Sequence, residues 1–358
     1  MSRETFHCGI QPGRVLPRRA FFILEVFMSQ PEKAGRGRNR PALRLVETRN
    51  LSRNEWLDVR KNGIGGSDAA AAVGLNPYMS PLELWLIKTG RDANLPRPNR
   101  DDTTEPVYWG TLLEPIVAAS YTKQTGNKVR RINAVLQHPT IPFMLANIDR
   151  EVVGNCDVQL LECKTAGEFG ARLWRDGVPE YVQLQVQHQL AVTGKQAADV
   201  AVLLCGQRLE VHRIERDDGL IARLIELEAA FWRFVETDTP PPADGSDSAD
   251  RVLRCLFPGA GGTVDFTNDR KLSAAFADLV AVRAAIQTRQ QVEAQLKQTI
   301  QQAMGEADQA LFETGSISYK RSKDASTIDL KRLLADQPQL AAQYALTKPG
   351  SRRFLIFV

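Results

Sequence analysis

The side chains best suited to chemistry in this sequence lie within residues 148–164. Glu162 and Lys164 are two residues apart in a predicted strand, so both project from one face and Cys163 projects from the other. Asp149 lies thirteen residues before Glu162, on a segment predicted to form the preceding antiparallel strand. Hairpin pairing would bring the two carboxylates together, and two carboxylates with an amine suit a divalent metal and a positioned water. A salt bridge on a solvated hairpin explains the same residues.

A Gly-rich turn at residues 63–66 leads into a helix of small residues, with Ser67 expected near its N-cap. Exposed backbone N–H groups at such a turn can bind phosphate, and an arginine such as Arg60 suits bidentate phosphate contact. The turn is not a Walker A loop, because no Gly-Lys-Ser/Thr sequence follows it. These residues predict a phosphate clamp, although a plain turn also accounts for them.

Two predicted helices carry polar residues that could support such a site. A helix over 108–126 holds Glu114 beside apolar neighbours, where a buried carboxylate would need a partner. A helix over 179–192 places Gln185 and Gln189 four residues apart on one face. A glutamine beside a metal can hold the attacking water. A surface glutamate and a helix rich in glutamine are the simpler alternatives.

Composition narrows the classes of protein that this chain can be. The net charge is +4, but residues 1–45 hold nine Lys/Arg and three Asp/Glu, which leaves the remainder at about −2. Binding to nucleic acid would therefore need a local basic surface. Five scattered cysteines without a CxxC pair argue against a disulfide framework and a structural zinc site. No apolar run approaches the ~20 residues of a membrane span, so we expect a cytoplasmic protein with no membrane partner.

The elements that must position these residues divide the chain into four parts. Residues 1–45 are predicted to be a disordered basic segment, in which Met28 is an alternative start that would make residues 1–27 dispensable. Residues 46–238 are predicted to form the folded α/β domain. A linker rich in Pro and Gly is expected over residues 239–262.

The last part, residues 263–358, is predicted to hold a long helix and a small basic α/β appendage. Apolar residues spaced by three and four over 271–304 fit a helix packed on a partner, as in a coiled coil. The basic end could follow DNA phosphates or form a solvated surface.

Taken in order, short pieces of the sequence resemble the YqaJ-type viral recombinase and phage lambda exonuclease family. The resemblance covers roughly residues 60–213. The pieces that carry it are Gly65-Gly66-Ser67-Asp68, Asn76-Pro77-Tyr78, Ser80-Pro81-Leu82-Glu83-Leu84-Trp85, Trp109-Gly110 with Glu114-Pro115, Ala146-Asn147-Ile148-Asp149, Glu162-Cys163-Lys164-Thr165 and Gln185-Val186-Gln187-His188.

The resemblance implies a restriction-endonuclease-like (PD-(D/E)xK) α/β core, with a central mixed sheet flanked by helices and a C-terminal helical/β appendage. It also implies phosphodiester hydrolysis that depends on Mg²⁺, for which Mn²⁺ can substitute. Carried over by position, the metal ligands are Asp149, Glu162 and the backbone carbonyl of Cys163. Glu114 supports the metal site indirectly, from a neighbouring helix.

The resemblance assigns roles to the remaining candidates as well. Lys164 would orient or deprotonate the attacking water, and Gln185 would lie near that water. Arg60 and Ser67 would form a pocket for a terminal 5′-phosphate, which implies a 5′→3′ polarity. Relatives often carry an aromatic residue three places before Gln185, whereas here Tyr181 stands four places before it.

The implied function is an exonuclease acting on the ends of linear double-stranded DNA in phage or prophage recombination. Its product would pass to a single-strand annealing protein, and relatives form ring-type trimers. Two alternatives stay open at this point: a structure-specific DNA endonuclease with the same metal centre, and a non-catalytic DNA-binding protein.

Overall fold

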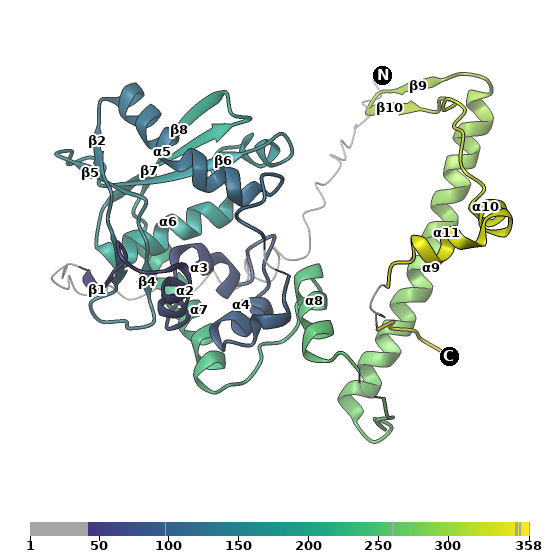
Figure 1. The fold of residues 1–358 in the computed structure, drawn as a ribbon, viewed down its shortest axis with the longest axis horizontal. Helices are drawn as coiled ribbons and strands as arrows, with labels where there is room; N and C mark the ends of the chain where they lie inside the picture. Colours follow the sequence, from purple (N-terminus) through teal and green to yellow (C-terminus); the bar gives the residue numbers. More distant parts are fainter. Residues whose placement is uncertain (1–41, 97, 260, 348–349, 351, 358) are drawn as a thin grey trace, which may run out of the picture. The chain divides into compact units, whose positions relative to one another are not determined.

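The computed structural model describes residues 42–96, 98–259, 261–347, 350 and 352–357. The predictions made for residues 1–41, including the start at Met28, lie outside the described residues. The chain divides into two compact units, one ending at Leu253 and one beginning at Arg254. Each unit is described by itself (Figure 1).

A five-stranded mixed sheet organises the first unit, in the order β2-β5-β6-β7-β8. β6 and β7 are parallel and the other neighbours are antiparallel. The strands are β2 (Lys128–Arg130), β5 (Arg150–Val153), β6 (Leu160–Ala166), β7 (Ala197–Leu204) and β8 (Arg208–Glu215). Parallel neighbours need a crossover, and α6 (Glu180–Thr193) supplies it between β6 and β7.

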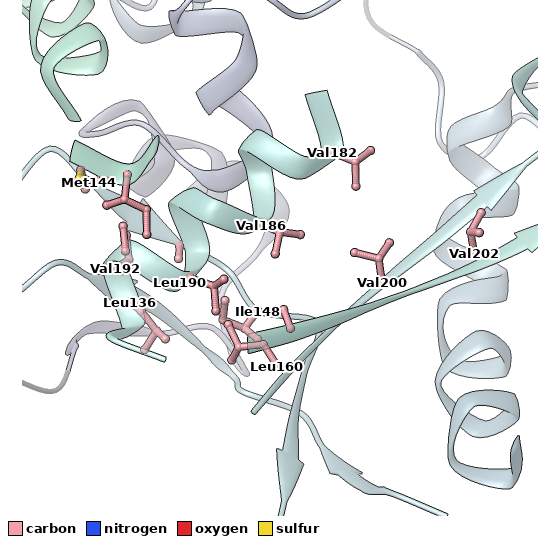
Figure 2. Close-up of a cluster of buried hydrophobic side chains, with 14 of the residues drawn as sticks. Leu136, Met144, Ile148, Leu160, Val182, Val186, Leu190, Val192, Val200 and Val202 are labelled. Atoms are coloured by element: carbon pink, nitrogen blue, oxygen red, sulfur yellow. The ribbon is translucent and has the colours of Figure 1, made fainter. Parts of the chain in front are cut away.

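Alternation along the strands divides the core between the two faces of this sheet. On one face Leu160 and Val200 pack under Val186 and other apolar residues of α6 (Figure 2). On the other face Leu161 packs with Tyr121 of α5 (Pro106–Thr125). The predicted architecture, a central mixed sheet flanked by helices, is confirmed.

Four further helices complete the helical layer around α6. Two of them, α3 and α7, contact α6 itself. Gly66 to Ala72 form α3, which packs on α6 and α7; Ala70, Leu184 and Leu224 form a small buried cluster there. The Trp85 side chain of α4 donates a hydrogen bond to the Phe234 carbonyl of α7. The helices are α2 (Arg53–Lys61), α3 (Gly66–Ala72), α4 (Pro81–Lys88) and α7 (Asp218–Glu236), and the 3-10 turns are η2 (Asp92–Asn94) and η3 (Gly170–Trp174).

A second sheet of three short strands joins the Gly-rich turn to the rest of the domain. Its order is β1-β3-β4, from β1 (Leu43–Glu47), β3 (Ala134–Gln137) and β4 (Leu145–Ala146). Ile64 exchanges backbone hydrogen bonds with Phe143 and Leu145. Order therefore begins earlier than predicted. The disordered segment was expected to extend to residue 45, but β1 begins at Leu43 and pairs with β3 about ninety residues later in the chain.

The segment 239–262, predicted to be a linker, contains helix α8 (Asp247–Leu256). The Ser248 hydroxyl donates to the Ser80 hydroxyl at 2.9 Å, and Ala249 and Val252 are buried. These contacts attach the first part of α8 to the start of α4, so the folded domain extends beyond the predicted end at residue 238.

The second unit consists mainly of one long helix. α9 (Arg270–Met304) matches the predicted helix over 271–304, and none of its residues is buried. A hairpin of β9 (Gln309–Phe312) and β10 (Gly315–Ser318) follows, and then come α10 (Leu330–Asp336) and α11 (Pro338–Gln343). The coiled-coil partner for α9 stays a prediction. Within the described residues, no helix is long and apolar enough to cross a membrane.

Candidate active site

The two carboxylates of the predicted hairpin lie at the point where β5 and β6 meet. Arg150 pairs with Leu161 in the antiparallel register, which places Asp149 and Glu162 at the next pair along the two strands. The Asp149 Oδ2 atom accepts a hydrogen bond of 2.9 Å from the backbone N–H of Cys163. The structure therefore brings together the two acids that the sequence separates by thirteen residues.

Glutamine side chains from α6 hold Glu162 in place. Gln185 Nε2 donates to Glu162 Oε1 at 2.5 Å, and Gln189 Nε2 donates to Glu162 Oε2 at 2.8 Å. Both glutamines point at the sheet because they are one helical turn apart. Glu162 is 5% exposed, so these donors replace the water that its carboxylate loses on burial.

Lys164 completes this cluster from the same face of β6. Its Nζ atom lies 2.8 Å from Glu162 Oε1 and donates to Gln185 Oε1 at 2.8 Å. Loss of hydration opposes the charge on Lys164, but the adjacent carboxylate of Glu162 outweighs it and raises the pKa of the lysine. The side chain is therefore a charged donor, which suits orienting water and offsetting negative charge better than removing a proton.

Asp149 is in the opposite electrostatic situation. Loss of hydration, followed by the negative charge of Glu162, raises the pKa of Asp149 to about 8. The hydrogen bond from Cys163 and the charge of Lys164 act in the other direction without cancelling this effect. Asp149 therefore takes up a proton more readily than a free carboxyl, and a divalent cation bound there would replace that proton and favour the ionised form of both carboxylates.

The donor set fits a hard divalent cation. Mg²⁺ keeps several waters and takes one or two carboxylates, so Asp149 and Glu162 with the Cys163 carbonyl would be sufficient oxygen donors. Within the part of the chain that the structure describes, no group of three or more His, Cys, Asp or Glu side chains is arranged to hold a metal. The proposed site accordingly depends on two side chains and one backbone oxygen.

Glu114 lies near this centre but is held by arginines. Its Oε1 atom accepts from Arg150 Nη1 at 2.6 Å and lies 3.6 Å from Arg131 Nη2. The negative charge of Glu114 still contributes to the raised pKa of Asp149. The structure therefore links Glu114 to the acid pair through Arg150, the residue that follows Asp149.

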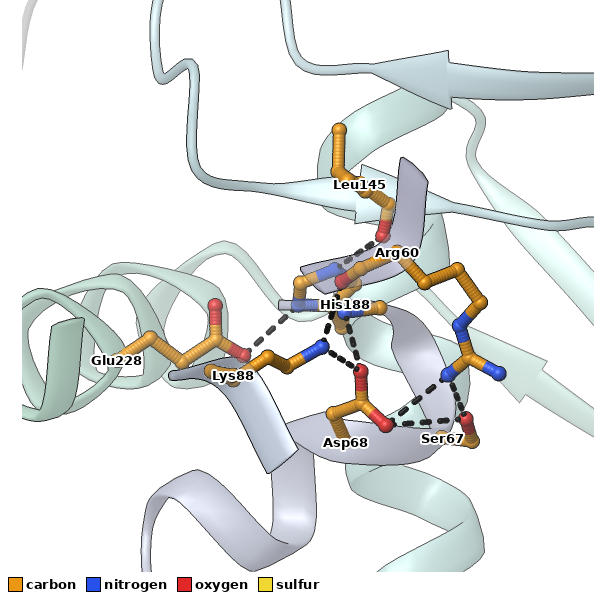
Figure 3. Close-up of polar contacts among 8 residues, drawn as sticks. Arg60, Ser67, Asp68, Lys88, Leu145, His188 and Glu228 are labelled. Atoms are coloured by element: carbon orange, nitrogen blue, oxygen red, sulfur yellow. Dashed lines mark hydrogen bonds and ion pairs between the residues drawn. The ribbon is translucent and has the colours of Figure 1, made fainter. Parts of the chain in front are cut away.

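The predicted phosphate clamp forms a separate polar cluster (Figure 3). Arg60 Nη2 donates to the Ser67 hydroxyl at 2.7 Å and to Asp68 Oδ1 at 3.0 Å. Lys88 Nζ donates to Asp68 Oδ2 at 2.7 Å. The N-cap of α3 is Gly65, so Ser67 lies in the first turn of the helix, near the N-cap as expected.

Gly66 connects this cluster to the acid centre. A Cβ atom on Gly66 would lie 3.1 Å from Gln189 Cγ and 3.4 Å from Gln185 Cγ. The absence of a side chain at Gly66 lets α3 approach the two glutamines closely without displacing them. Ser67, the next residue, is thus linked through Gly66 and these glutamines to Glu162, which both glutamines contact.

A buried histidine of α6 connects this helix to β4, the strand that precedes Asp149. His188 is fully buried; its Nδ1 atom lies 2.8 Å from Glu228 Oε1 and its Nε2 atom 2.8 Å from the Leu145 carbonyl (Figure 3). Loss of hydration lowers the pKa of His188, but Glu228 outweighs it and raises the pKa. Through its two ring nitrogens, His188 joins α6 to α7 and to β4.

Two other residues near the centre have clear surroundings. Cys163 projects toward the α5 face, where burial raises the pKa of its thiol far above the ordinary range. Its contribution is therefore through the backbone. The Tyr181 ring packs edge-on against Tyr78, with centroids 5.8 Å apart, and interacts electrostatically with Lys164.

The resemblance assigned no role to several side chains that the structure places in these clusters. The spacing of four from Gln185 had placed Gln189 on the same helix face, and Arg150 was detectable by its position beside Asp149. Nothing local marks Asp68 as the carboxylate that pairs with both Arg60 and Lys88, because Lys88 lies twenty residues further along the chain. That ion pair is a tertiary contact.

The mixed sheet with its flanking helices is the α/β arrangement that the sequence resemblance implies. Residues 55–196 match the family model of the YqaJ-like viral recombinase domain. This part of the chain is therefore similar to the YqaJ-like viral recombinase domain, in line with the resemblance of the sequence motifs.

Individual proteins show similarity as well. The chain is 42% identical over 214 residues to the uncharacterized protein YqaJ of Bacillus subtilis, and the match spans 59% of this chain and 65% of that protein. Among solved structures, an alkaline exonuclease from Laribacter hongkongensis has 26% identity and a TM-score of 0.42, covering 52% of this chain and 93% of that one. A phage-related exonuclease from Haemophilus somnus has 12% identity and a TM-score of 0.35, covering 49% and 94%.

Proposed function

We propose that this protein is a metal-dependent DNA exonuclease that hydrolyses phosphodiester bonds at the ends of linear double-stranded DNA. The observation that carries the proposal is the convergence of Asp149, Glu162 and Lys164 on one side of the β5–β6 pair, with Gln185 bound to both Glu162 and Lys164. The match of residues 55–196 to the YqaJ-like viral recombinase domain supports a role in DNA recombination of the phage type.

The residues of the chain would divide the work of hydrolysis. Asp149, Glu162 and the Cys163 carbonyl would hold Mg²⁺ or Mn²⁺, which when bound polarises the phosphoryl oxygen and acidifies a bound water. Lys164, as an ammonium group, would orient the attacking water and offset negative charge that develops on the phosphate. Gln185 fixes the position of Lys164, and Arg150 keeps Glu114 beside the centre.

A 5′→3′ polarity is part of this proposal. Arg60 and Ser67 lie close enough to contact the same phosphate group. Gly66, beside Ser67, packs against the helix that bears Gln185. A terminal 5′-phosphate bound there would be a fixed distance from the scissile bond. Asp68 takes part of the charge of Arg60, so the pocket would bind phosphate less strongly than an isolated arginine would.

In this role the protein would act in the cytoplasm on DNA ends and leave a 3′ single strand. A single-strand annealing protein would take up that strand, and a ring-type trimer would enclose the duplex. Light scattering of the purified chain, with and without duplex, measures the oligomer directly.

Digestion of matched DNA forms tests the activity. With Mg²⁺ the protein should degrade linear duplex with a 5′-phosphate faster than the same duplex without it, and should leave closed circles intact. Cleavage of closed circles would reassign the centre to an endonuclease. No cleavage of any form with Mg²⁺ or Mn²⁺ would leave only the non-catalytic DNA-binding function.

Lys164→Ala is the informative variant for this centre. Removing the ammonium group should lower the single-turnover rate by roughly a thousandfold, the scale of one lost transition-state donor. Its affinity for the duplex in the presence of a chelator should stay within a few-fold of the wild type. Equal rates in the variant and the wild type would remove the role assigned to Lys164.

A further inference from the structure

A basic pocket on the first unit has no part in the chemistry described above. The cavity is about 630 Å³ in volume and lies where β1, the end of β2 and the end of α6 meet. Its lining holds five basic side chains against two acidic ones. The basic residues are Arg44, Arg49, Arg130, Arg131 and Lys195.

The cations of this basic pocket are only partly compensated. Glu151 is shared between Arg130 at 2.7 Å and Lys195 at 3.7 Å, and Glu47 lies 3.9 Å from Arg44. The side chains of Arg44, Arg130, Arg131 and Lys195 are 60%, 68%, 57% and 39% exposed. An exposed excess of positive charge attracts a polyanion.

The carboxyl end of α6 also borders the basic pocket, and its partial negative charge would act against an anion. Arg216 satisfies that end: its Nη1 atom donates to the Leu190 carbonyl at 2.6 Å and to the Lys195 carbonyl at 3.5 Å. Arg216, which is not part of the lining, therefore offsets the partial negative charge of the helix end. The arginines of the lining remain able to attract an anion.

The basic pocket begins next to the acid centre. Arg131 belongs to the lining and also lies 3.6 Å from Glu114, whose other partner is Arg150, the residue after Asp149. The cluster of Arg60, Ser67 and Asp68 is linked to the same centre through other residues, Gly66 and Gln185. The acid pair is thus connected to two separate cationic sites.

The lining favours a phosphate backbone over a nucleoside. No aromatic side chain is among the residues that line the pocket, so no ring is present on which a nucleobase could stack. Spaced arginines and a lysine bind successive phosphates without reading bases. A chain of phosphates is the polyanion that this spacing fits best.

We propose that the basic pocket binds the phosphates of the DNA strand that continues beyond the bond being cut. The inference rests on the proposed function, since it places the strand end at Arg60 and the rest of the strand at the basic pocket, which adjoins the acid centre through Arg131 and Glu114. The pocket then keeps the substrate attached while its end is shortened. Degradation of one strand without release would depend on it.

A binding assay with the full chain tests this inference in the presence of a chelator. The variant is Arg44→Gln/Arg49→Gln, and the charge-matched control is Arg208→Gln/Arg223→Gln, two arginines of the first unit outside the pocket. The probe is a labelled 5′-phosphorylated duplex in a long form and in a form too short to extend beyond the cut.

The pocket variant should bind the long duplex about tenfold more weakly at moderate salt. The slope of log K against log[salt] should fall by roughly 2, since each lost phosphate contact contributes about 0.9. Binding of the short duplex should match the wild type, which also shows that the variant is folded. The control pair should bind both duplexes like the wild type.

Several outcomes would overturn the inference: an unchanged affinity and salt slope in the pocket variant, an equal loss in the control pair, or no binding of DNA by the wild type. Unchanged DNA affinity with lost binding of polyglutamate would reassign the pocket to an acidic protein. Hydrolysis by the wild type is measured separately with Mg²⁺. A wild type that binds through the pocket without cutting would refute the proposed function alone.

Discussion

Two aspartates of the first unit, Asp68 and Asp149, have opposite electrostatic surroundings. Burial alone would raise the pKa of Asp68, but Arg60 at 3.0 Å and Lys88 at 2.7 Å hold its pKa well below the usual range (Figure 3). Burial and the charge of Glu162 raise the pKa of Asp149 to about 8. Both carboxylates accept one backbone N–H, so the difference comes from their charged neighbours.

This difference distinguishes a carboxylate that stabilises the fold from one that could act as a metal ligand. Cations of the chain itself neutralise Asp68, and the resulting cluster joins α2, α3 and α4. Asp149 faces a second carboxylate, and the single lysine nearby cannot neutralise both. A divalent cation from solution would favour the ionised form of both carboxylates, and this is the property that the proposed metal-dependent hydrolase needs.

Asp149→Asn should have the largest effect on activity and little effect on folding. The amide keeps the acceptor for Cys163 but removes a proposed metal ligand, so the hydrolysis rate should fall by a factor of about a thousand or more. In chelator the free energy of unfolding should stay equal or rise, because the repulsion with Glu162 is gone. Single-turnover hydrolysis and urea unfolding measure the two quantities. A variant with nearly normal activity would exclude Asp149 as a ligand.

Asp68→Asn should show the reverse pattern in stability. Removing one partner of a buried ion pair leaves Lys88, whose side chain is 2% exposed, without its counter-charge. The expected loss of unfolding free energy is about 3–5 kcal/mol. Asp58→Asn is the matched control, since Asp58 pairs with Lys61 at the surface and should cost less than ~1 kcal/mol. Equal losses in the two variants would show that the Asp68 cluster is not structural.

Divalent cations should stabilise the wild type but not Asp149→Asn. A ligand bound only by the folded state adds about 2.7 kcal/mol at a concentration of 100 Kd. Thermal unfolding with increasing Mg²⁺ should raise the Tm of the wild type, and Asp58→Asn should keep this increment. An increment of the same size in Asp149→Asn would place the bound cation elsewhere.

Gly66→Ala should have the smallest of these effects. Its Cβ would press on Gln189 and Gln185 at 3.1 and 3.4 Å, and flexible side chains can yield at modest cost. We expect hydrolysis to slow by roughly tenfold, since small displacements near a reacting centre are costly. Gly110→Ala, whose Cβ would lie 3.8 Å from Thr165, is the control and should retain the wild-type rate. Equal rates in both variants would show that the α3–α6 contact does not position the glutamines.

Local sequence patterns predicted which side chains of the site share a face, but they did not predict where the folded domain begins and ends. The period of two along β6 places Glu162 and Lys164 on one face, and the helical period places Gln185 and Gln189 together. The strand β1 and the helix α8 were missed for a common reason. Their partners are β3, about ninety residues later, and Ser80, 168 residues earlier, and no local signal reports contacts over such separations.

The sequence by itself determined the types and spacings of the reacting groups, because strand and helix periods fix which side chains share a face. Its short motifs also carried the resemblance to the YqaJ-like viral recombinase domain, whose family model matches residues 55–196. Only the tertiary structure decided which carboxylate is neutralised. Arg60 and Lys88 come together at Asp68 through the packing of separate helices, whereas the antiparallel register sets Asp149 beside Glu162. Charge compensation depends on distances across the fold, and spacing along the chain does not contain them.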